Sequence, residues 1–272
     1  MSQHIYLPDH TGSIGVFDSG IGGLSVANAV SGLLPAESLL YVSDNAHAPY
    51  GARTDDEVRA YSRRLTEFLL RAGAKLIVVA CNTATSVAID DLRETFPAVP
   101  FVGLEPAVKP AARSRSVAVL ATAVTLRSTR YRTLRETYLA DRPVWESACP
   151  GLVDLIETHP SGSPVIREYL TELFATTDQP DAVVLGCTHY PLIASDITAV
   201  LGPDVRVIDP SGAAARQVQR LLEERGLTEN RDVRTIYDFY CTGGSAPLQR
   251  TLLALTALNS HRRWVVPYLP LN

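Results

Sequence analysis

The sequence predicts an α/β protein with two similar, pseudo-symmetric α/β domains, each holding a mostly parallel sheet, and a cleft between them. The first observation is an apolar run, L-I-V-V-A over 76–80, which ends at Cys81 and is typical of a buried parallel strand. The second is its return as A-V-V-L-G over 182–186, directly before Cys187. The third is that strand-like and helix-like segments alternate along the chain. Ligands of open α/β sheets bind at such carboxyl strand ends.

An internal duplication is indicated by the spacing of three strand ends. Cys81 and Cys187 are 106 residues apart, and the pair Glu105-Pro106 returns after 104 residues as Asp209-Pro210. The first strand of each half ends at Asp18 and Ala121, which are 103 residues apart. Strand-helix-strand units all look somewhat alike, but three matches in order favour two related domains.

The first half predicts four strands and three helices. Strands are expected over 14–17, 39–42, 76–80 and 100–104, where short apolar runs end at polar residues. Helices are expected over 20–34, 55–72 and 84–96. The helix over 55–72 has apolar residues near helical spacing, at Val58, Tyr61, Leu65, Phe68 and Leu69.

The second half repeats this order and then adds a further segment. Strands are expected over 117–121, around 144–146, and over 182–186 and 205–208, with helices over 125–139, 152–157 and 164–175. After residue 210 a helix over 211–225, a strand over 234–241, a helix over 246–258 and a closing strand over 264–269 are expected. Because chain ends often lie close together, we expect residues 1–107 and 211–272 to form the first domain and 108–210 the second.

Composition excludes several classes of function. The chain has 272 residues, with 46% hydrophobic and 20% charged residues, which allows real cores. A formal net charge of −4 argues against a nucleic-acid partner. No apolar run approaches the roughly 20 residues that cross a bilayer, and the polar start of the chain does not resemble a secretion signal. We therefore expect a cytoplasmic protein with no membrane partner.

Four cysteines are present, and two of them stand out. In a reducing cytosol a structural disulfide is not expected, and no pair has the C-x-x-C spacing of a zinc site. Cys149 and Cys241 are expected to pack as small apolar side chains. Cys81 and Cys187, at equivalent strand ends of two related domains, would face each other across the cleft. Two thiols on opposite sides of one carbon suit removal of a proton from one face and its return to the other.

Neighbouring polar residues would tune these thiols and hold a substrate. Asp18 can orient or deprotonate Cys81, and His189, with Glu157, can do the same for Cys187. Each has a plainer reading, since Asp18-Ser19 before a helix is a natural N-cap and His189 can be a loop residue. Helix N-termini after the cysteines offer N–H donors for a carboxylate. Side-chain hydrogen bonds would come from Ser19, Asn82, Thr83, Thr122 and Thr188.

At these residues the sequence resembles the glutamate racemase family. The matching phrases are F-D-S-G-I-G-G over 17–23, P-Y-G over 49–51, A-C-N-T-A over 80–84 and G-C-T-H-Y-P over 186–191. Weaker matches are Thr122 with Thr125, and Cys149-Pro150 with Glu157. The resemblance spans 14–243, nearly the whole chain.

The resemblance implies a cofactor-independent, two-base racemisation of glutamate that supplies D-glutamate for peptidoglycan. Cys81 would take the α-proton from D-glutamate, assisted by Asp18, and Cys187 would take it from L-glutamate, assisted by His189 and Glu157. Members of the family often form homodimers. The substrate would be held by Asp18, Ser19, Pro49, Tyr50, Gly51, Asn82, Thr83, Thr122, Thr188 and His189.

One departure and three alternatives accompany this reading. Val124 stands where the family usually has glycine, which can reshape the wall near Thr122. The chain can instead be a related racemase or isomerase, such as an aspartate racemase. Gly20-x-Gly22 with Asp44 half-resembles a dinucleotide site, although that reading leaves both cysteines unexplained. A redox or metal switch, or a protein-binding regulator, is the third alternative, and activity without cofactor would separate it from an enzyme.

Overall fold

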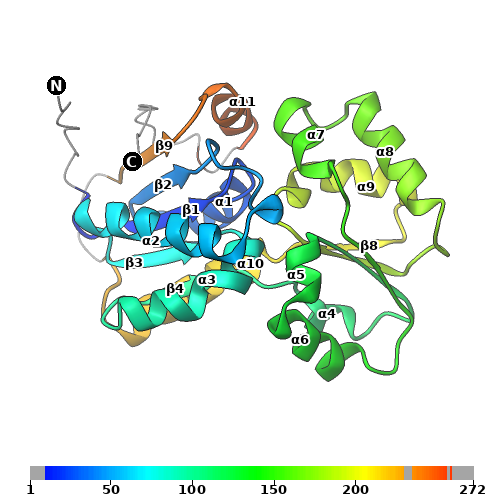
Figure 1. Ribbon diagram of the computed structural model, residues 1–272, viewed down its shortest axis with the longest axis horizontal. Coiled ribbons are helices and arrows are strands. Elements are labelled where there is room, and N and C mark those ends of the chain that lie inside the picture. Colours follow the sequence, from blue (N-terminus) through cyan, green and yellow to red (C-terminus); the bar gives the residue numbers. More distant parts are fainter. Residues whose placement is uncertain (1–9, 230–234, 256–257, 259–272) are drawn as a thin grey trace.

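The computed structural model describes residues 10–229, 235–255 and 258, which form two lobes, each around a parallel sheet (Figure 1). The first sheet has the strand order β4-β3-β1-β2-β9. All its pairings are parallel. Its strands are β1 (Ile14–Asp18), β2 (Leu39–Ser43), β3 (Leu76–Val79), β4 (Phe101–Gly103) and β9 (Tyr237–Cys241).

Helices cover both faces of this first sheet. Alternate residues of β1 point to opposite faces, so Val16 joins one core and Phe17 the other. The core with Val16 is closed by α1 (Leu24–Leu33), α10 (Ser211–Glu224) and α11 (Ala246–Ala254). The core with Phe17 is closed by α2 (Asp55–Arg71) and α3 (Asn82–Thr95), and the 3₁₀ turn η1 (Tyr50–Ala52) adds Tyr50 to it.

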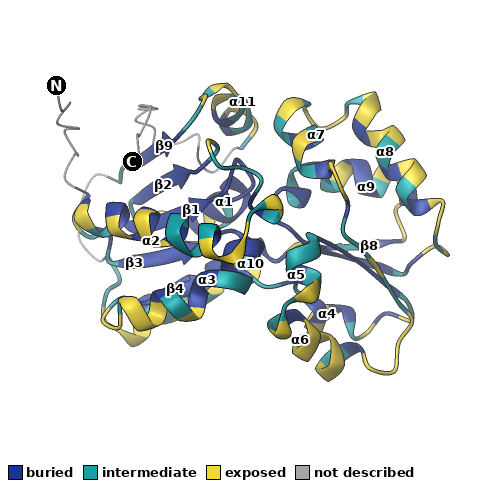
Figure 2. Ribbon diagram, viewed as in Figure 1, coloured by how far each residue is buried: buried dark blue, intermediate teal, exposed yellow. Residues whose placement is uncertain are grey.

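The second sheet has four strands in the order β6-β5-β7-β8, again all parallel. The strands are β5 (Val117–Ala121), β6 (Val144–Ser147), β7 (Ala182–Gly186) and β8 (Arg206–Ile208). One face is covered by α7 (Leu152–Thr158), α8 (Pro164–Phe174), η2 (Tyr190–Ile193) and α9 (Ala194–Leu201), and the other by α4 (Val108–Ala111) and α6 (Thr129–Leu139). The strands of the first sheet and the central strands β5 and β7 of the second are buried, whereas the edge strands β6 and β8 are partly exposed, as are the outer faces of the helices (Figure 2).

The two lobes share one topology, which confirms the duplicated α/β architecture. The order β4-β3-β1-β2 is matched by β8-β7-β5-β6, and β9 is an addition to the first sheet. The register is also kept. Ile14 of β1 pairs with Leu76 of β3, and their counterparts Val117 and Ala182 pair in the same way.

The chain returns to the first sheet after β8. Strand β9 pairs with β2, and α10 packs against α1. Val108 and Ala111 of α4 already belong to the core of the second sheet. From these contacts we propose that the domains divide after residues 107 and 210.

Local differences from the sequence prediction are small. The first helix begins at Leu24, because residues 19–23 form a tight turn. The helix predicted over 125–139 is two helices, α5 (Ala123–Arg127) and α6, because Ser128 caps a new N-terminus, with its hydroxyl accepting the N–H of Tyr131. Helix α11 ends at Ala254, and the strand predicted over 264–269 lies outside the described residues. Within the part of the chain that the structure describes, no helix is both long and apolar enough to cross a bilayer.

Candidate active site

The carboxyl ends of β1, β3, β5 and β7 meet at a cavity between the two lobes. Both cysteines line it, Cys81 from the end of β3 and Cys187 from the end of β7. Its volume is about 20 Å³, enough for about one water molecule. The structure thus brings together most of the residues predicted from the sequence. The cavity is lined by Ser19, Pro49, Tyr50, Gly51, Cys81, Asn82, Thr83, Thr122, Val153, Cys187, Thr188 and His189.

Cys81 is the N-cap of α3. Its sulfur accepts a hydrogen bond from the backbone N–H of Ala84 at 3.4 Å, and its thiol lies 3.7 Å from the hydroxyl oxygen of Ser19. Burial raises the pKa of the Cys81 thiol well above its usual range, and the negative charge of Asp18 raises it further. A thiolate formed here is therefore a strong base, and the N–H groups at the helix N-terminus stabilise it.

Asp18 lies behind Cys81 and is fully buried. One carboxylate oxygen accepts the N–H of Gly20 at 3.0 Å, and the other accepts the hydroxyl of Thr188 at 3.2 Å. Burial raises the pKa of Asp18, whereas the charge of His189 lowers it. This carboxyl group belongs to the first sheet but contacts the loop that carries the second cysteine.

Cys187 has a histidine and a glutamate as neighbours. Nδ1 of His189 lies 3.8 Å from the Cys187 sulfur, and Nε2 lies 2.8 Å from Oε1 of Glu157. The backbone N–H of Ile21 donates to the same glutamate oxygen at 2.9 Å, across the lobe boundary.

These contacts favour the charged forms of both His189 and Glu157. Burial alone would lower the pKa of His189, but the hydrogen bonds to Cys187 and Glu157 raise it well above its ordinary value. Burial would likewise raise the pKa of Glu157, but its hydrogen bond and attraction to His189 lower it. The imidazolium can therefore donate a proton toward the Cys187 sulfur while Glu157 balances its charge.

The glycine loop after β1 is shaped by close contact with this pair. A methyl group on Gly22 would lie 2.5 Å from Nδ1 of His189 and 2.6 Å from the hydroxyl oxygen of Thr188. A methyl group on Gly20 would overlap Oε1 of Glu157. The glycines thus allow residues of the second lobe to pack closely against this loop. Their presence is explained by this packing and does not require a dinucleotide-binding site.

Asp44, which the sequence analysis considered as a ribose ligand, forms a hydrogen bond with Tyr50 instead. Its buried carboxylate accepts the hydroxyl of Tyr50 at 2.6 Å, the hydroxyl of Thr242 at 2.7 Å and lies 2.9 Å from Nδ1 of His47. With these partners the carboxylate fixes Tyr50 at the rim of the cavity. The sequence signal for this role was only the acid at the end of the second strand.

Threonine and asparagine side chains complete the wall. The hydroxyl oxygens of Thr83 and Thr122 lie 2.9 Å apart across the lobe boundary, and Thr122 also caps α5 through the N–H of Thr125. Asn82 donates to the carbonyl of Leu104 at 3.2 Å. Its buried Oδ1 has no hydrogen-bond partner among residues 10–229, 235–255 and 258. That oxygen is available as an acceptor for a bound cation such as an ammonium group.

The positions of two valines differ from what the sequence predicted. Val153, which was not predicted, supplies an apolar wall from α7, one turn before Glu157. Val124 does not line the cavity; it borders a separate hollow of about 220 Å³ with Arg127 and Asp55. Cys149 and Cys241 are buried outside the cavity lining.

Comparison with known proteins shows which family this chain resembles. The sequence model for the Asp/Glu/hydantoin racemases matches residues 24–218. A glutamate racemase from Pseudomonas aeruginosa is 45% identical over 228 residues, which cover 82% of this chain and 86% of that protein.

Solved structures show the same relationship. Glutamate racemase from Francisella tularensis, in complex with D-glutamate, superposes with a TM-score of 0.80 at 29% identity, covering 97% of this chain and 99% of that one. Glutamate racemase from Escherichia coli, in complex with L-glutamate and the activator UDP-MurNAc-Ala, gives 0.78 at 32% identity, covering 90% and 94%.

Proposed function

The chain belongs to the Asp/Glu/hydantoin racemase family and is an amino-acid racemase, and we propose that it interconverts L- and D-glutamate with Cys81 and Cys187 as its two bases. One observation carries this proposal: two thiols end equivalent strands of duplicated lobes and line one cavity. Each thiol has its own proton-handling neighbours, Asp18 for Cys81 and His189 for Cys187.

The reaction moves one proton at each face of the α-carbon. With L-glutamate, the thiolate of Cys187 takes the α-proton and the electron pair of the C–H bond stays on the α-carbon. The thiol of Cys81 then gives its proton to the opposite face, which yields D-glutamate and leaves Cys81 as the thiolate. The enzyme is then in the form that accepts D-glutamate, and the reverse reaction follows the same steps.

Substrate binding would use the polar wall already described. The N–H groups at the start of α3, with the hydroxyls of Thr83 and Thr188, suit a carboxylate. The carboxylate of Asp18 and the open oxygen of Asn82 suit the ammonium group. A cavity of about 20 Å³ does not admit glutamate, since ligand sites usually measure about 300–1,000 Å³. The two lobes must therefore separate to take up substrate.

The wider role follows from the same proposal. D-glutamate made here would enter peptidoglycan synthesis in the cytoplasm, and the protein would act as a homodimer, as in the family it resembles. Light scattering on the purified protein measures the dimer directly, and a mass of one chain, 29.5 kDa, would contradict it.

The proposal is tested by racemisation in D₂O without added cofactor. L-Glutamate is incubated with the enzyme, inversion is followed by circular dichroism and α-deuterium by proton NMR, and aspartate serves as the control substrate. We expect deuterium in the product but not in recovered substrate at early times, because the two faces use different thiols. Absence of inversion with either enantiomer would reject the racemase, and faster turnover of aspartate would reassign the substrate. Equal deuterium in substrate and product would reject the two-base mechanism.

A further inference from the structure

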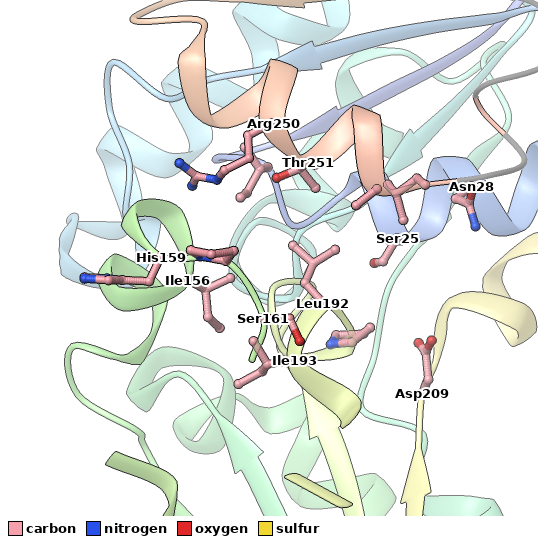
Figure 3. Close-up of a pocket in the computed structure, with 15 residues that line it drawn as sticks. Ser25, Asn28, Ile156, His159, Ser161, Leu192, Ile193, Asp209, Arg250 and Thr251 are labelled. Atoms are coloured by element: carbon pink, nitrogen blue, oxygen red, sulfur yellow. The ribbon is translucent and has the colours of Figure 1, made fainter. Parts of the chain in front are cut away.

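Arg250 joins the last helix of the first lobe to the catalytic side of the second. Helix α11 is anchored to the first core by Leu248 and Leu252. Arg250, between them in sequence, borders a hollow of about 350 Å³ between the lobes. In Figure 3 its guanidinium extends toward α7, the helix that carries Ile156 and is followed by His159.

The partner of Arg250 is the backbone of Glu157. Its Nη2 donates a hydrogen bond to the carbonyl oxygen of Glu157. This carbonyl lies in the last turn of α7, beyond which the helix supplies no further N–H donor. A cation is favoured at that end by the helix dipole. Because α7 is anchored in the second core through Leu152 and Ile156, the bond crosses from one core to the other.

The same glutamate is held at its side chain by two other groups. Oε1 of Glu157 accepts the N–H of Ile21 at 2.9 Å and pairs with Nε2 of His189 at 2.8 Å. Those bonds fix the end of the side chain, and the bond from Arg250 fixes the backbone from which it starts. The positive charge of Arg250 also helps to hold the pKa of Glu157 low, after the larger effect of its bond to His189.

Cys81 lacks this dependence on a distant residue. Its partners, Asp18, Ser19 and the N-terminus of α3, all belong to the first lobe. The bond to Asp18 from the second lobe comes from Thr188, in the loop after β7, and not from α7. Displacement of α11 from α7 would therefore act first on the Cys187 side.

We propose that Arg250 is a positioning residue for proton transfer at Cys187, holding Glu157 where its carboxylate meets His189. This inference rests on the proposed two-thiol racemisation. Racemisation rates alone cannot test it. L- and D-glutamate are mirror images, so the equilibrium constant is one and kcat/KM must fall equally in both directions.

A substrate that needs only one base separates the two sides. In 3-chloroglutamate one thiolate removes the α-proton, the electron pair forms the Cα–Cβ double bond and chloride leaves. The resulting enamine hydrolyses to 2-oxoglutarate and ammonium, which are measured. The L enantiomer reports Cys187 and the D enantiomer reports Cys81.

We expect Arg250→Gln to slow elimination from the L enantiomer by about tenfold to about a hundredfold, the effect of a lost positioning contact. Elimination from the D enantiomer should stay within about twofold of the wild type. Arg250→Lys keeps one charge and a donor, so it should recover part of the L-side rate. The matched control is Arg220→Gln, which alters an arginine whose partners among the described residues are Gln217 and Glu224 of its own helix α10.

Equal losses for both enantiomers, or no loss for either, would overturn the proposal. Thermal unfolding of each variant shows whether it is folded, and Arg250→Lys provides the test if the glutamine variant is not. Wild-type enzyme that eliminates chloride but does not racemise glutamate would instead reject the proposed function.

Discussion

The two sides of the cavity share their placement but differ in their proton chemistry. Cys81 and Cys187 both follow a buried strand, and the two strands hold equivalent positions in their sheets. Cys81 caps α3, a helix of 14 residues, whereas Cys187 precedes η2, a 3₁₀ turn of four residues. A short turn has only a weak dipole, so its N-terminus stabilises a thiolate less than a long helix does. Near Cys187 the positive charge comes instead from the imidazole of His189, which is paired with Glu157.

The duplicated fold therefore accounts for where the two thiols lie, whereas the residues around each thiol determine how it exchanges protons. Equivalent strand ends of the two lobes bring both thiols to one cavity, and in the proposed reaction one thiol would lie on each face of the α-carbon. Each thiol is then served by what its own surroundings hold, a carboxylate and a helix end on one side, a charged histidine on the other. The two sides can therefore be separated by variants that affect one and spare the other.

The largest effect is expected from removing either thiol. Cys81→Ala and Cys187→Ala should each lower racemisation by more than about a thousandfold, because both protons must move in every turnover. Each variant should keep chloride elimination from one enantiomer of 3-chloroglutamate, L for Cys81→Ala and D for Cys187→Ala. Near-native racemisation by either variant would refute the two-base assignment. The matched control is Cys241→Ala, which removes a buried thiol outside the cavity lining.

A smaller and one-sided effect is expected from Glu157→Gln. Loss of the carboxylate lowers the pKa of His189, because the Glu157 bond and charge help to raise it, and the imidazolium is then depleted as pH rises. L-side elimination should fall by about a hundredfold at neutral pH, with D-side elimination within about threefold. Glu105→Gln is the control, since Glu105 also links the lobes but pairs with Arg130, whereas Glu157 pairs with His189. Equal losses on both sides would show that Glu157 acts on the whole cavity.

Asp18→Asn should have opposite effects on how readily the Cys81 thiol ionises and on the rate of the reaction that uses Cys81 as its base. The charge of Asp18 raises the pKa of the Cys81 thiol, so its removal lowers that pKa and the thiolate forms at lower pH. In a Cys187→Ala background, alkylation of Cys81 by iodoacetamide at pH 8 should become about threefold to about tenfold faster. Elimination from the D enantiomer should become slower, because the base is weaker. An unchanged alkylation rate, located by peptide mass spectrometry, would mean that Asp18 is uncharged beside Cys81. Asp209→Asn, at another strand end, is the control.

The fold could be predicted because buried parallel strands leave a plain signal. Apolar runs ending at polar residues marked both sheets, and the recurring Cys and acid-Pro phrases marked the duplication. The break at Ser128 was missed, since a hydroxyl that caps a new helix looks locally like any polar helix residue. Helix α4 is four residues long, too short to show a period.

The cavity lining was predicted less evenly. Residues next to the two cysteines follow from strand ends, but Tyr50 required the family resemblance, because its position depends on a tertiary contact with Asp44. Val153 was missed because an apolar residue in a short helix looks like core. Arg250 meets Glu157 across 93 residues of sequence, a contact that no local pattern encodes.

The smallest effect is expected at the one departure from the family pattern. Val124 borders the hollow with Asp55 and Arg127, outside the cavity of the two thiols, whereas Thr122 two residues earlier lines that cavity and caps α5. Val124→Gly should therefore leave kcat/KM for both enantiomers within about twofold, while lowering the free energy of unfolding by about 0.5 kcal/mol, because glycine has a lower helix propensity than valine. Racemisation assays and urea unfolding measure the two quantities. A loss of activity as large as that of Thr122→Val, the matched variant inside the cavity, would mean that residue 124 shapes the site through Thr122.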